Sequence, residues 1–372
     1  MKTAIVLTTI NIPKLLFDYA DNFEKYRHEK TMIDFIIVGD LKTPSSSAEI
    51  AESLSERGFN AIYFSVKKQK EWLLKFPKLN KIVPYNSDNR RNLGYLLAKE
   101  RGAESIISID DDNYPQQDKD YLLGHSMIGQ NKELLEVLSE NNWYNICRHL
   151  ETKPKRTIYP RGFPYSKRWK DGQAFKKTSG RIVMNAGLWL EFPDVDAVTN
   201  LNELIKVVSV EQKNYMLSFS VFSPINTQNT AFYKDILPCY WYVRMGEVVQ
   251  GTKIDRYGDI LSGFFAQKVI HHMGDRISFG LPAAIHRRNT HDFLEDLRQE
   301  MSGMILVEKL IPILESIKLC SNSYEGSYLE LSNKISDWAK QSNKLSKSEK
   351  EYFQGITDSM KVWVEVCEKI SS

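Results

Sequence analysis

The sequence of 372 residues contains few cysteines and no paired cysteine spacing. Its four cysteines lie far apart, at Cys147, Cys239, Cys320 and Cys367. A disulfide-stapled scaffold and a cysteine-based zinc site are therefore excluded, and we expect a reduced protein of the cytoplasm. No apolar run is long enough to cross a bilayer, and the apolar start at 4–10 lacks the cleavage pattern of a secretion signal.

An excess of one charge is also absent. The chain has 50 basic and 47 acidic residues, a formal net charge of +3, so the total does not imply a polyanionic partner. Hydrophobic residues make up 42% and charged residues 26%, values typical of globular proteins, which excludes disorder for the chain as a whole. The length fits two units, or one large α/β domain with a helical appendage.

One segment departs from this balance. The segment from Arg148 to Arg181 contains eleven Lys or Arg residues and only two acids, Glu151 and Asp171. Its formal charge is therefore +9, and that of the rest of the chain is −6. A solvated loop is one interpretation, and an anion-binding rim is the other. Aromatic residues interleave with the basic ones, as in nucleic-acid-binding surfaces. We nevertheless expect no nucleic-acid partner, because an acidic triplet elsewhere favours a different chemistry.

Short apolar runs alternate with helical patterns in the first third of the chain. β-branched runs predict buried strands, and apolar spacing closed by glycine predicts helices. The predicted strands are 4–10, 34–40, 61–66 and 105–109, and the predicted helices are 45–58 and 89–101. This alternation indicates a parallel sheet covered by helices, the nucleotide-binding kind of α/β architecture.

The pattern changes twice further along. The region 150–290 is rich in Pro, Gly and aromatics, and we interpret it as a loop-rich continuation of the same fold that builds a site. From 292 onward the spacing is helical, and 346–349 fits a capping box that opens a last helix. We therefore predict a catalytic domain at 1–290 and a helical extension at 291–372, through which copies of the chain could associate.

The strongest local feature is the run Ile-Asp-Asp-Asp-Asn at 109–113, directly after a predicted buried strand. Three successive carboxylates repel one another, and a divalent cation with oxygen ligands relieves this repulsion. At the carboxyl edge of a parallel sheet such a cation can hold a nucleotide diphosphate. The alternative is an acidic turn in solvent.

A second candidate site lies at the predicted helix start near residue 88. Arg90, Arg91, Asn92 and the free backbone amides there could hold phosphate or ribose groups. A capping role at the surface is the alternative for Asp88.

Six stretches of the sequence, the acidic run among them, occur in the same order in known proteins. They are 92–98, 109–113, 160–166, 185–197, 226–237 and 256–263. Together they resemble the STELLO-like glycosyltransferases and the reversibly glycosylated polypeptides, the UDP-arabinopyranose mutase family. The similarity runs from about residue 3 to residue 312, so the last helices lie beyond it.

The resemblance implies a GT-A-type fold, a nucleotide-sugar-binding α/β sheet with an Asp-x-Asp metal motif. Asp110, Asp111 and Asp112 would contact Mn²⁺ or Mg²⁺ and the donor diphosphate. His286 would join Asp110 and Asp112 as a metal ligand, or contact a phosphate. A histidine that merely ends a strand is the alternative for His286.

The resemblance also implies roles at other positions. Asp259 matches the second acid of the mutases' Tyr-Asp-Asp run and is the expected acid/base or acceptor-orienting residue, whereas Gly258 stands at the position of the first acid. Arg161 matches the position of self-glycosylation, but a phosphate clamp is the chemically simpler role that we favour. Thr8, Thr9 and Asp40, which lie at the ends of the first two predicted strands, are expected to contact the nucleotide.

We therefore expect a metal-dependent glycosyltransferase that moves a sugar from a nucleotide-sugar donor, most simply a UDP-sugar, to a glycan or other acceptor. Two alternatives stay open. One is a nucleotide-sugar mutase with self-glycosylation, and the other is a non-catalytic sugar-nucleotide-binding protein.

Overall fold

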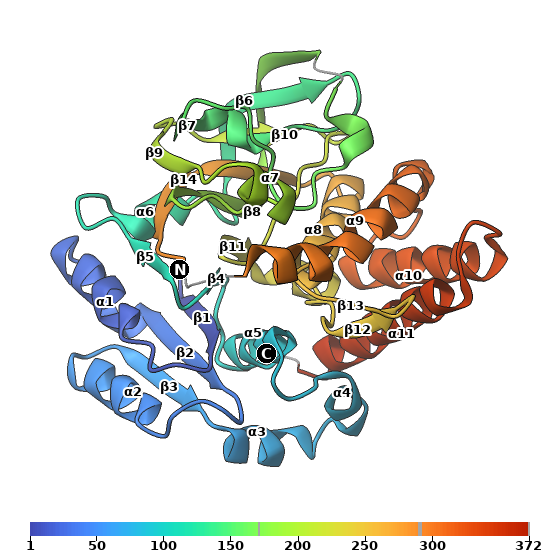
Figure 1. Cartoon of the computed structure of the whole chain (residues 1–372). Coiled ribbons are helices and arrows are strands. Elements are labelled where there is room, and N and C mark those ends of the chain that lie inside the picture. Colours follow the sequence, from blue (N-terminus) through green and yellow to red (C-terminus); the bar gives the residue numbers. More distant parts are fainter. Residues whose placement is uncertain (170–171, 289–291, 371–372) are drawn as a thin grey trace.

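One large mixed sheet forms the centre of the molecule, and helices cover it (Figure 1). The computed structural model describes residues 1–169, 172–288 and 292–370. The strands of the sheet are β1 (Thr3–Thr9), β2 (Ile33–Gly39), β3 (Asn60–Phe64), β4 (Ser105–Ile109), β5 (Asn113–Pro115), β6 (Asn131–Ser139), β7 (Leu150–Lys153), β8 (Gln173–Glu191), β9 (Lys206–Val210), β10 (Tyr215–Leu217), β11 (Asn229–Tyr233) and β14 (Arg276–His286). Its main path is β3-β2-β1-β4-β11-β8-β6-β10-β14-β5, and β7 and β9 pair beside it. The predicted fold class is confirmed.

The first four strands form the parallel part of the sheet. β1 lies between β2 and β4 and runs parallel to both, as the apolar runs predict. Helices α1 (Leu15–Lys25) and α2 (Ser47–Glu56) pack on one face, while α3 (Val66–Leu73) and α5 (Arg91–Glu100) pack on the other. Both faces of β1, β2 and β4 are therefore buried, which explains their hydrophobic character, whereas β3 at the edge of the sheet is half-buried.

Helix α5 lies unusually close to the sheet because of a glycine. A Cβ atom added at Gly94 would come within 2.5 Å of Val6 Cγ1 and 2.8 Å of Val38 Cγ2. The short 3₁₀ helix η2 (Asp88–Arg90) precedes α5 and extends it toward the carboxyl ends of the parallel strands. Residues at this helix start are thereby brought to the same edge of the sheet as the acidic triplet.

Strand β14 brings a distant part of the chain next to the acidic triplet. It pairs antiparallel with β5, and His286 stands opposite Asn113 in this register. It also runs parallel to β8. The pairing brings His286 next to the acidic triplet, although the two are far apart in the chain.

The region 150–290 continues the same sheet but is more regular than predicted. It contains β8, a strand of 19 residues, and helix α8 (Gly258–His272). The shorter helices of the chain are η1 (Lys30–Met32), α4 (Pro77–Ile82), α6 (Tyr121–His125), η3 (Ile146–His149), η4 (Tyr165–Lys167), α7 (Ala197–Asn202) and η5 (Lys234–Cys239). A separate hairpin is formed by β12 (Glu247–Val249) and β13 (Thr252–Ile254).

Three helices close the chain, as predicted. They are α9 (Phe293–Ser316), α10 (Tyr324–Gln341) and α11 (Lys347–Lys369), and the capping box of Ser346 and Glu349 opens the last one. These helices share the hydrophobic core of the sheet region: the Trp363 ring lies 5.3 Å from that of Trp241. None of the described helices is both long and apolar enough to cross a membrane.

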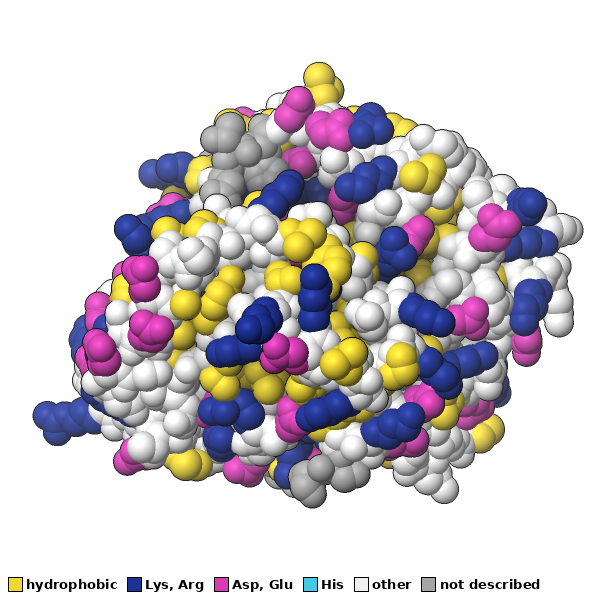
Figure 2. Space-filling view, turned by 90° about the horizontal axis from the view of Figure 1, so that it is seen from below, with side chains coloured by type: hydrophobic (Ala, Val, Ile, Leu, Met, Phe, Trp, Pro, Cys, Tyr) yellow, Lys and Arg dark blue, Asp and Glu magenta, His cyan; other side chains and the backbone are white. Residues whose placement is uncertain are grey.

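The surface reflects the near-neutral charge of the chain. On the face seen from below in Figure 1, Lys and Arg side chains lie among Asp, Glu and scattered hydrophobic side chains (Figure 2). Neither sign of charge covers this face.

Candidate active site

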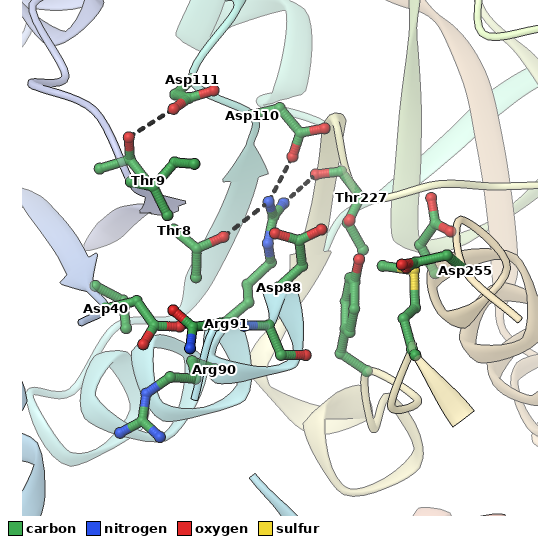
Figure 3. A pocket seen from close by; sticks show the side chains of 18 of the residues that line it. Thr8, Thr9, Asp40, Asp88, Arg90, Arg91, Asp110, Asp111, Thr227 and Asp255 are labelled. Atoms are coloured by element: carbon green, nitrogen blue, oxygen red, sulfur yellow. Dashed lines mark hydrogen bonds and ion pairs between the residues drawn. The ribbon is translucent and has the colours of Figure 1, made fainter. Parts of the chain in front are cut away.

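A cavity of about 750 Å³ lies at the carboxyl ends of β1, β2 and β4 (Figure 3). This volume is within the range of small-molecule and cofactor sites. Seven acidic and seven basic residues line it, so its formal charge balances. The acids are Asp40, Asp88, Asp110, Asp111, Asp112, Asp255 and Asp259, and the bases are Lys42, Arg90, Arg91, Arg161, Arg244, Lys253 and Arg256.

The three carboxylates of the acidic triplet all line this cavity but have different partners. Asp110 forms an ion pair with Arg91. Asp111 accepts hydrogen bonds from Thr9 Oγ1 at 2.5 Å and from Asn11 Nδ2 at 3.1 Å. Burial and the neighbouring carboxylates raise the pKa of Asp111, while these two hydrogen bonds lower it, and the net direction is upward. The triplet is therefore part of a built site and is not an acidic turn in solvent.

Asp112 faces His286 across a short gap. The Asp112 Oδ2 and His286 Nε2 atoms are 3.4 Å apart, and His286 Nδ1 donates to the Phe192 carbonyl at 2.6 Å. This second bond fixes the ring so that Nε2 points at the carboxylate. Burial lowers the pKa of His286, but the hydrogen bond and charge of Asp112 outweigh it and raise that pKa. Either a proton on Nε2 or a cation between the two groups satisfies this arrangement.

The predicted set of three metal ligands is not assembled. Within residues 1–169, 172–288 and 292–370 no group of three His, Cys, Asp or Glu side chains is gathered for a metal ion. Asp110 is held by Arg91 instead. Adjacent ligands of an octahedral Mg²⁺ lie about 3 Å apart, so Asp112 and His286 alone fit two neighbouring positions. The remaining ligands would have to come from a diphosphate and water.

Arg91 organises the strand ends and is not free for a phosphate. Its guanidinium donates to Ser108 Oγ at 2.8 Å, to the Thr227 carbonyl at 2.9 Å and to Thr8 Oγ1 at 3.2 Å, besides its ion pair with Asp110 (Figure 3). Arg91 is 2% exposed. It therefore positions Asp110 and Thr8 at the cavity wall.

The two neighbours of Arg91 also have partners within the protein. Arg90 donates to Gln69 Oε1 at 2.7 Å and lies 4.2 Å from the Tyr85 ring centre. Asn92 exchanges hydrogen bonds with the backbone of Tyr242, each 2.9 Å long, and it does not line the cavity. Both residues thus position cavity walls, and Asn92 acts from behind the wall.

Asp40 lies at the end of β2 and supports the opposite wall. Its carboxylate accepts from the backbone N–H of Leu41 at 2.7 Å and of Ser87 at 3.1 Å. Thr9, Thr8 and Asp40 therefore meet at one edge of the sheet, as expected from the strand ends.

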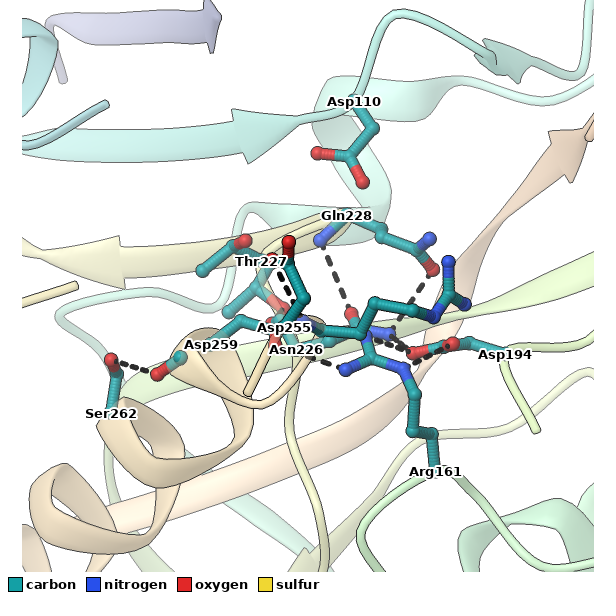
Figure 4. Close-up of polar contacts among 12 residues, drawn as sticks. Asp110, Arg161, Asp194, Asn226, Thr227, Gln228, Asp255, Asp259 and Ser262 are labelled. Carbon is teal, nitrogen blue, oxygen red and sulfur yellow. Dashed lines mark hydrogen bonds and ion pairs between the residues drawn. The ribbon is translucent and has the colours of Figure 1, made fainter. Parts of the chain in front are cut away.

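A buried cluster of three charges lies at the other end of the cavity (Figure 4). Arg161 donates to both carboxylate oxygens of Asp194, at 2.9 and 3.0 Å, and to both of Asp259, at 3.1 and 2.8 Å. All three side chains are only 5 or 6% exposed. Asn226 Nδ2 adds a hydrogen bond of 2.6 Å to Asp194. One cation between two carboxylates leaves this cluster with a net charge of −1.

The two acids of this cluster differ in their electrostatics. Burial raises the pKa of Asp194, but the charge and hydrogen bonds of Arg161 outweigh it and lower that pKa to about 2. For Asp259, burial and the nearby Asp194 charge prevail over Arg161, and its pKa is raised. The charge on Asp194 is thus favourable in the folded protein, whereas the charge on Asp259 is costly.

The basic segment 148–181 does not form the predicted anion-binding rim. Of its basic residues within the described ranges, Arg161 alone lines the cavity, and Lys170 lies outside the described residues. Acids elsewhere in the chain pair with six of the other described basic residues. Examples are Arg168 with Asp196, Lys167 with Glu315, Arg156 with Glu203 and Arg181 with Asp235. Of the two interpretations of this segment, the structure does not support the anion-binding rim, because local charge counting ignores these long-range partners.

Several residues of the site were not selected from the sequence. Asp194 lies in the Pro-Asp-Val-Asp turn at 193–196, so the motif that carries the resemblance contained the signal. Lys42, Tyr242 and Asp255 follow no recognisable motif and reach the cavity through folding alone. A capping role at the surface is the alternative that the sequence leaves open for Asp88, and the structure places its side chain in the cavity (Figure 3).

Comparison with known proteins gives the chain its family. The sequence profile of the reversibly glycosylated polypeptides matches residues 4–372. The chain belongs to the reversibly glycosylated polypeptide family. The match includes α9, α10 and α11, which corrects the expectation that the last helices lie beyond the shared region.

Curated relatives in this family are plant proteins. A probable UDP-arabinopyranose mutase 4 of Arabidopsis thaliana is 27% identical over 308 residues, which cover 79% of this chain and 75% of that protein. UDP-arabinopyranose mutase 1 of Oryza sativa subsp. japonica is 24% identical over 300 residues, or 78% and 73% of the two chains. Among solved structures, S. aureus TarS 1-349 in complex with UDP-GlcNAc covers 100% of this chain and 84% of its own, with 13% identity and a TM-score of 0.42. A structural likeness this weak carries no functional argument.

Proposed function

We propose that this protein is a nucleotide-sugar mutase, which interconverts the pyranose and furanose ring forms of a UDP-sugar. The curated relatives named above are UDP-arabinopyranose mutases, so UDP-arabinopyranose is the first substrate to test. Transfer to a separate acceptor, the function expected from the sequence, now ranks second. Several carboxylates and bases at one cavity also argue against a purely structural protein.

The observation that carries the proposal is the cluster of Arg161, Asp194 and Asp259. Both carboxylates occupy the guanidinium, and the cluster has a net charge of −1, so it is unsuited to clamp a phosphate. A negative cluster instead stabilises positive charge nearby. Ring interconversion requires the anomeric carbon to become electron-poor when its bond to oxygen breaks. We therefore place the sugar beside this cluster and the nucleotide beside Thr8, Thr9 and Asp40.

The charges of the cavity also support a need for a divalent cation. Six of its seven bases already have partners inside the protein, and for Lys42 the described residues offer none. A diphosphate placed near Asp110, Asp111 and Asp112 would meet three carboxylates, of which only Asp110 is paired with a base of the cavity. Asp112 and His286 would hold Mn²⁺ or Mg²⁺ between them. Such an ion, when bound, would neutralise the diphosphate and support its departure from the anomeric carbon.

The same cluster bears on self-glycosylation. If the sugar is transiently attached to Arg161, a guanidinium nitrogen must lose a proton as it bonds to the anomeric carbon. Asp259 accepts hydrogen bonds from both terminal nitrogens of Arg161, and its raised pKa suits it to receive that proton. This assigns Asp259 the acid/base role expected from the sequence, with Arg161 as its partner.

The experiment is to incubate the protein with UDP-arabinopyranose and Mn²⁺, without any acceptor, and to separate the nucleotide sugars by chromatography. Appearance of the furanose form, with little free UDP, supports the mutase. Release of UDP only when a glycan acceptor is added supports the transferase. Metal-dependent binding without turnover of any UDP-sugar supports a binding protein, and an Asp259→Asn variant should lose turnover in either enzyme.

A further inference from the structure

Asp88 is a carboxylate without a partner at the centre of the cavity. It lies in η2, and its side chain faces the cavity between Thr8 on one side and Asp255 on the other (Figure 3). No hydrogen bond or ion pair links this carboxylate to any part of the chain that the structure describes. The other acids of the cavity differ in this respect: Asp110 has Arg91, Asp255 has Lys253 and Asp259 has Arg161.

The backbone around Asp88 is held firmly on two sides. The Ser87 N–H donates to Asp40 Oδ2 at 3.1 Å, which ties the turn to the end of β2. Asn89 Nδ2 donates to the Tyr242 carbonyl at 2.5 Å, which ties it to the opposite wall. A carboxylate on such a fixed turn is positioned in advance and has free lone pairs for a ligand.

The charged groups around Asp88 act on its protonation. The Asp88 side chain is exposed to the open cavity, whose walls displace part of the water around its carboxylate. This partial desolvation raises its pKa, the charges of Asp110, Asp255 and Asp259 raise it further, and Arg91 lowers it, with a result of about 6. A carboxyl group in this range can both give and take a proton near neutral pH.

We propose that Asp88 carries the proton of the ring interconversion, an inference that rests on the mutase function proposed above. As the bond between C1 and the ring oxygen breaks, that oxygen leaves with the electron pair and takes the proton of the Asp88 carboxyl group. As the sugar hydroxyl that closes the new ring bonds to C1, its proton passes to the Asp88 carboxylate. One bond to oxygen breaks, one forms, and no oxidant or reductant is needed.

This role suits Asp88 better than the other acids. Thr9 and Asn11 hold Asp111, and Arg91 holds Asp110, so neither carboxylate is free to turn between two oxygens. Asp259 is fixed against Arg161 by two hydrogen bonds. Asp88 lines the same cavity as Arg161 and Asp259, and the charge of Asp259 acts on it, so a sugar placed beside Arg161 shares the cavity with the Asp88 carboxylate.

The test compares the wild type with Asp88→Asn, Asp88→Glu and the matched control Glu71→Gln, an exposed acid on α3. Turnover of UDP-arabinopyranose is measured together with calorimetric binding of UDP and Mn²⁺. Asp88→Asn should lose about 10²- to 10⁴-fold in kcat, with binding and KM little changed. Asp88→Glu should recover part of the loss, because it keeps the proton, and Glu71→Gln should match the wild type.

The pH profile gives an independent readout. The carboxyl group must be protonated when the ring opens, so wild-type kcat should fall as pH rises above about 6, and this limb should vanish in Asp88→Asn. A kcat of Asp88→Asn within tenfold of the wild type, or loss of UDP binding in that variant, overturns the proton-carrier role. If the wild type itself converts no UDP-sugar although it binds UDP, the proposed function fails instead.

Discussion

Neutralising the two acids that hold Arg161 should change the stability of the fold by different amounts. Asp194→Asn and Asp259→Asn are matched changes, since each removes one charge and retains one acceptor oxygen beside the same guanidinium. The pKa of Asp194 falls from the ordinary 3.8 to about 2, whereas that of Asp259 is raised. The charge of Asp194 therefore stabilises the folded state, and the charge of Asp259 does not.

The magnitude follows from the pKa of Asp194. A pKa shift of one unit corresponds to about 1.4 kcal/mol, so Asp194→Asn should lower the free energy of unfolding by roughly 2 to 3 kcal/mol near neutral pH. Asp259→Asn loses a hydrogen bond but removes a costly charge, and it should stay within about 1 kcal/mol of the wild type. Urea unfolding followed by fluorescence measures both values.

The pH dependence of stability tests whether the charge of Asp194 stabilises the fold. A lowered pKa means that the stabilisation by Asp194 is present above the unfolded value of 3.8 and is lost as pH falls toward about 2. The difference between the wild type and Asp194→Asn should therefore shrink over this interval. Equal losses for the two variants, or a difference that does not change with pH, would refute this account of the cluster.

Three further predictions follow from the structure. Binding of UDP should require Mn²⁺ or Mg²⁺, and His286→Ala should lower the affinity for the metal at least tenfold. Calorimetry with and without a chelator measures both effects, and UDP binding that is unchanged by the chelator, or a metal affinity that is unchanged in the variant, contradicts the prediction. Cys320 alone is exposed among the four cysteines, so Ellman's reagent should titrate one thiol in the native protein and four after unfolding; a second fast thiol contradicts the packing. Trp363 is buried against Trp241 and donates to the Leu237 carbonyl at 2.8 Å, so Trp363→Ala should cost about 3 to 5 kcal/mol in urea unfolding, and a loss below about 1 kcal/mol would show that α11 is not part of the core.

Local sequence patterns predicted the parallel part of the fold well. The runs that became β1, β2, β3 and β4 are mostly apolar, and their short length and β-branched residues favour strands over buried helix segments. Helix α8 gave no comparable signal. Thirteen of its 15 residues are buried, so it lacks the polar face that makes a helix visible in a sequence.

The site was predicted less completely than the fold, for a physical reason. The acidic triplet could be identified from the sequence because three adjacent carboxylates repel one another, which indicates a bound cation. The partners of Arg161 and Arg91 come from distant segments, and only strand pairing and helix packing show that both arginines are occupied by carboxylates. Asp88 resembles a helix cap locally, and its lack of a partner emerges only when the cavity is assembled.

The most direct test of the central claim is an approach to equilibrium from both sides. The protein with Mn²⁺ is mixed in separate samples with UDP-arabinopyranose and with UDP-arabinofuranose, without acceptor, and the ring forms are followed by NMR. The account predicts that both samples reach the same ratio of pyranose to furanose, with the diphosphate linkage retained. Unchanged ring forms in both samples, or net release of UDP in place of interconversion, would contradict it.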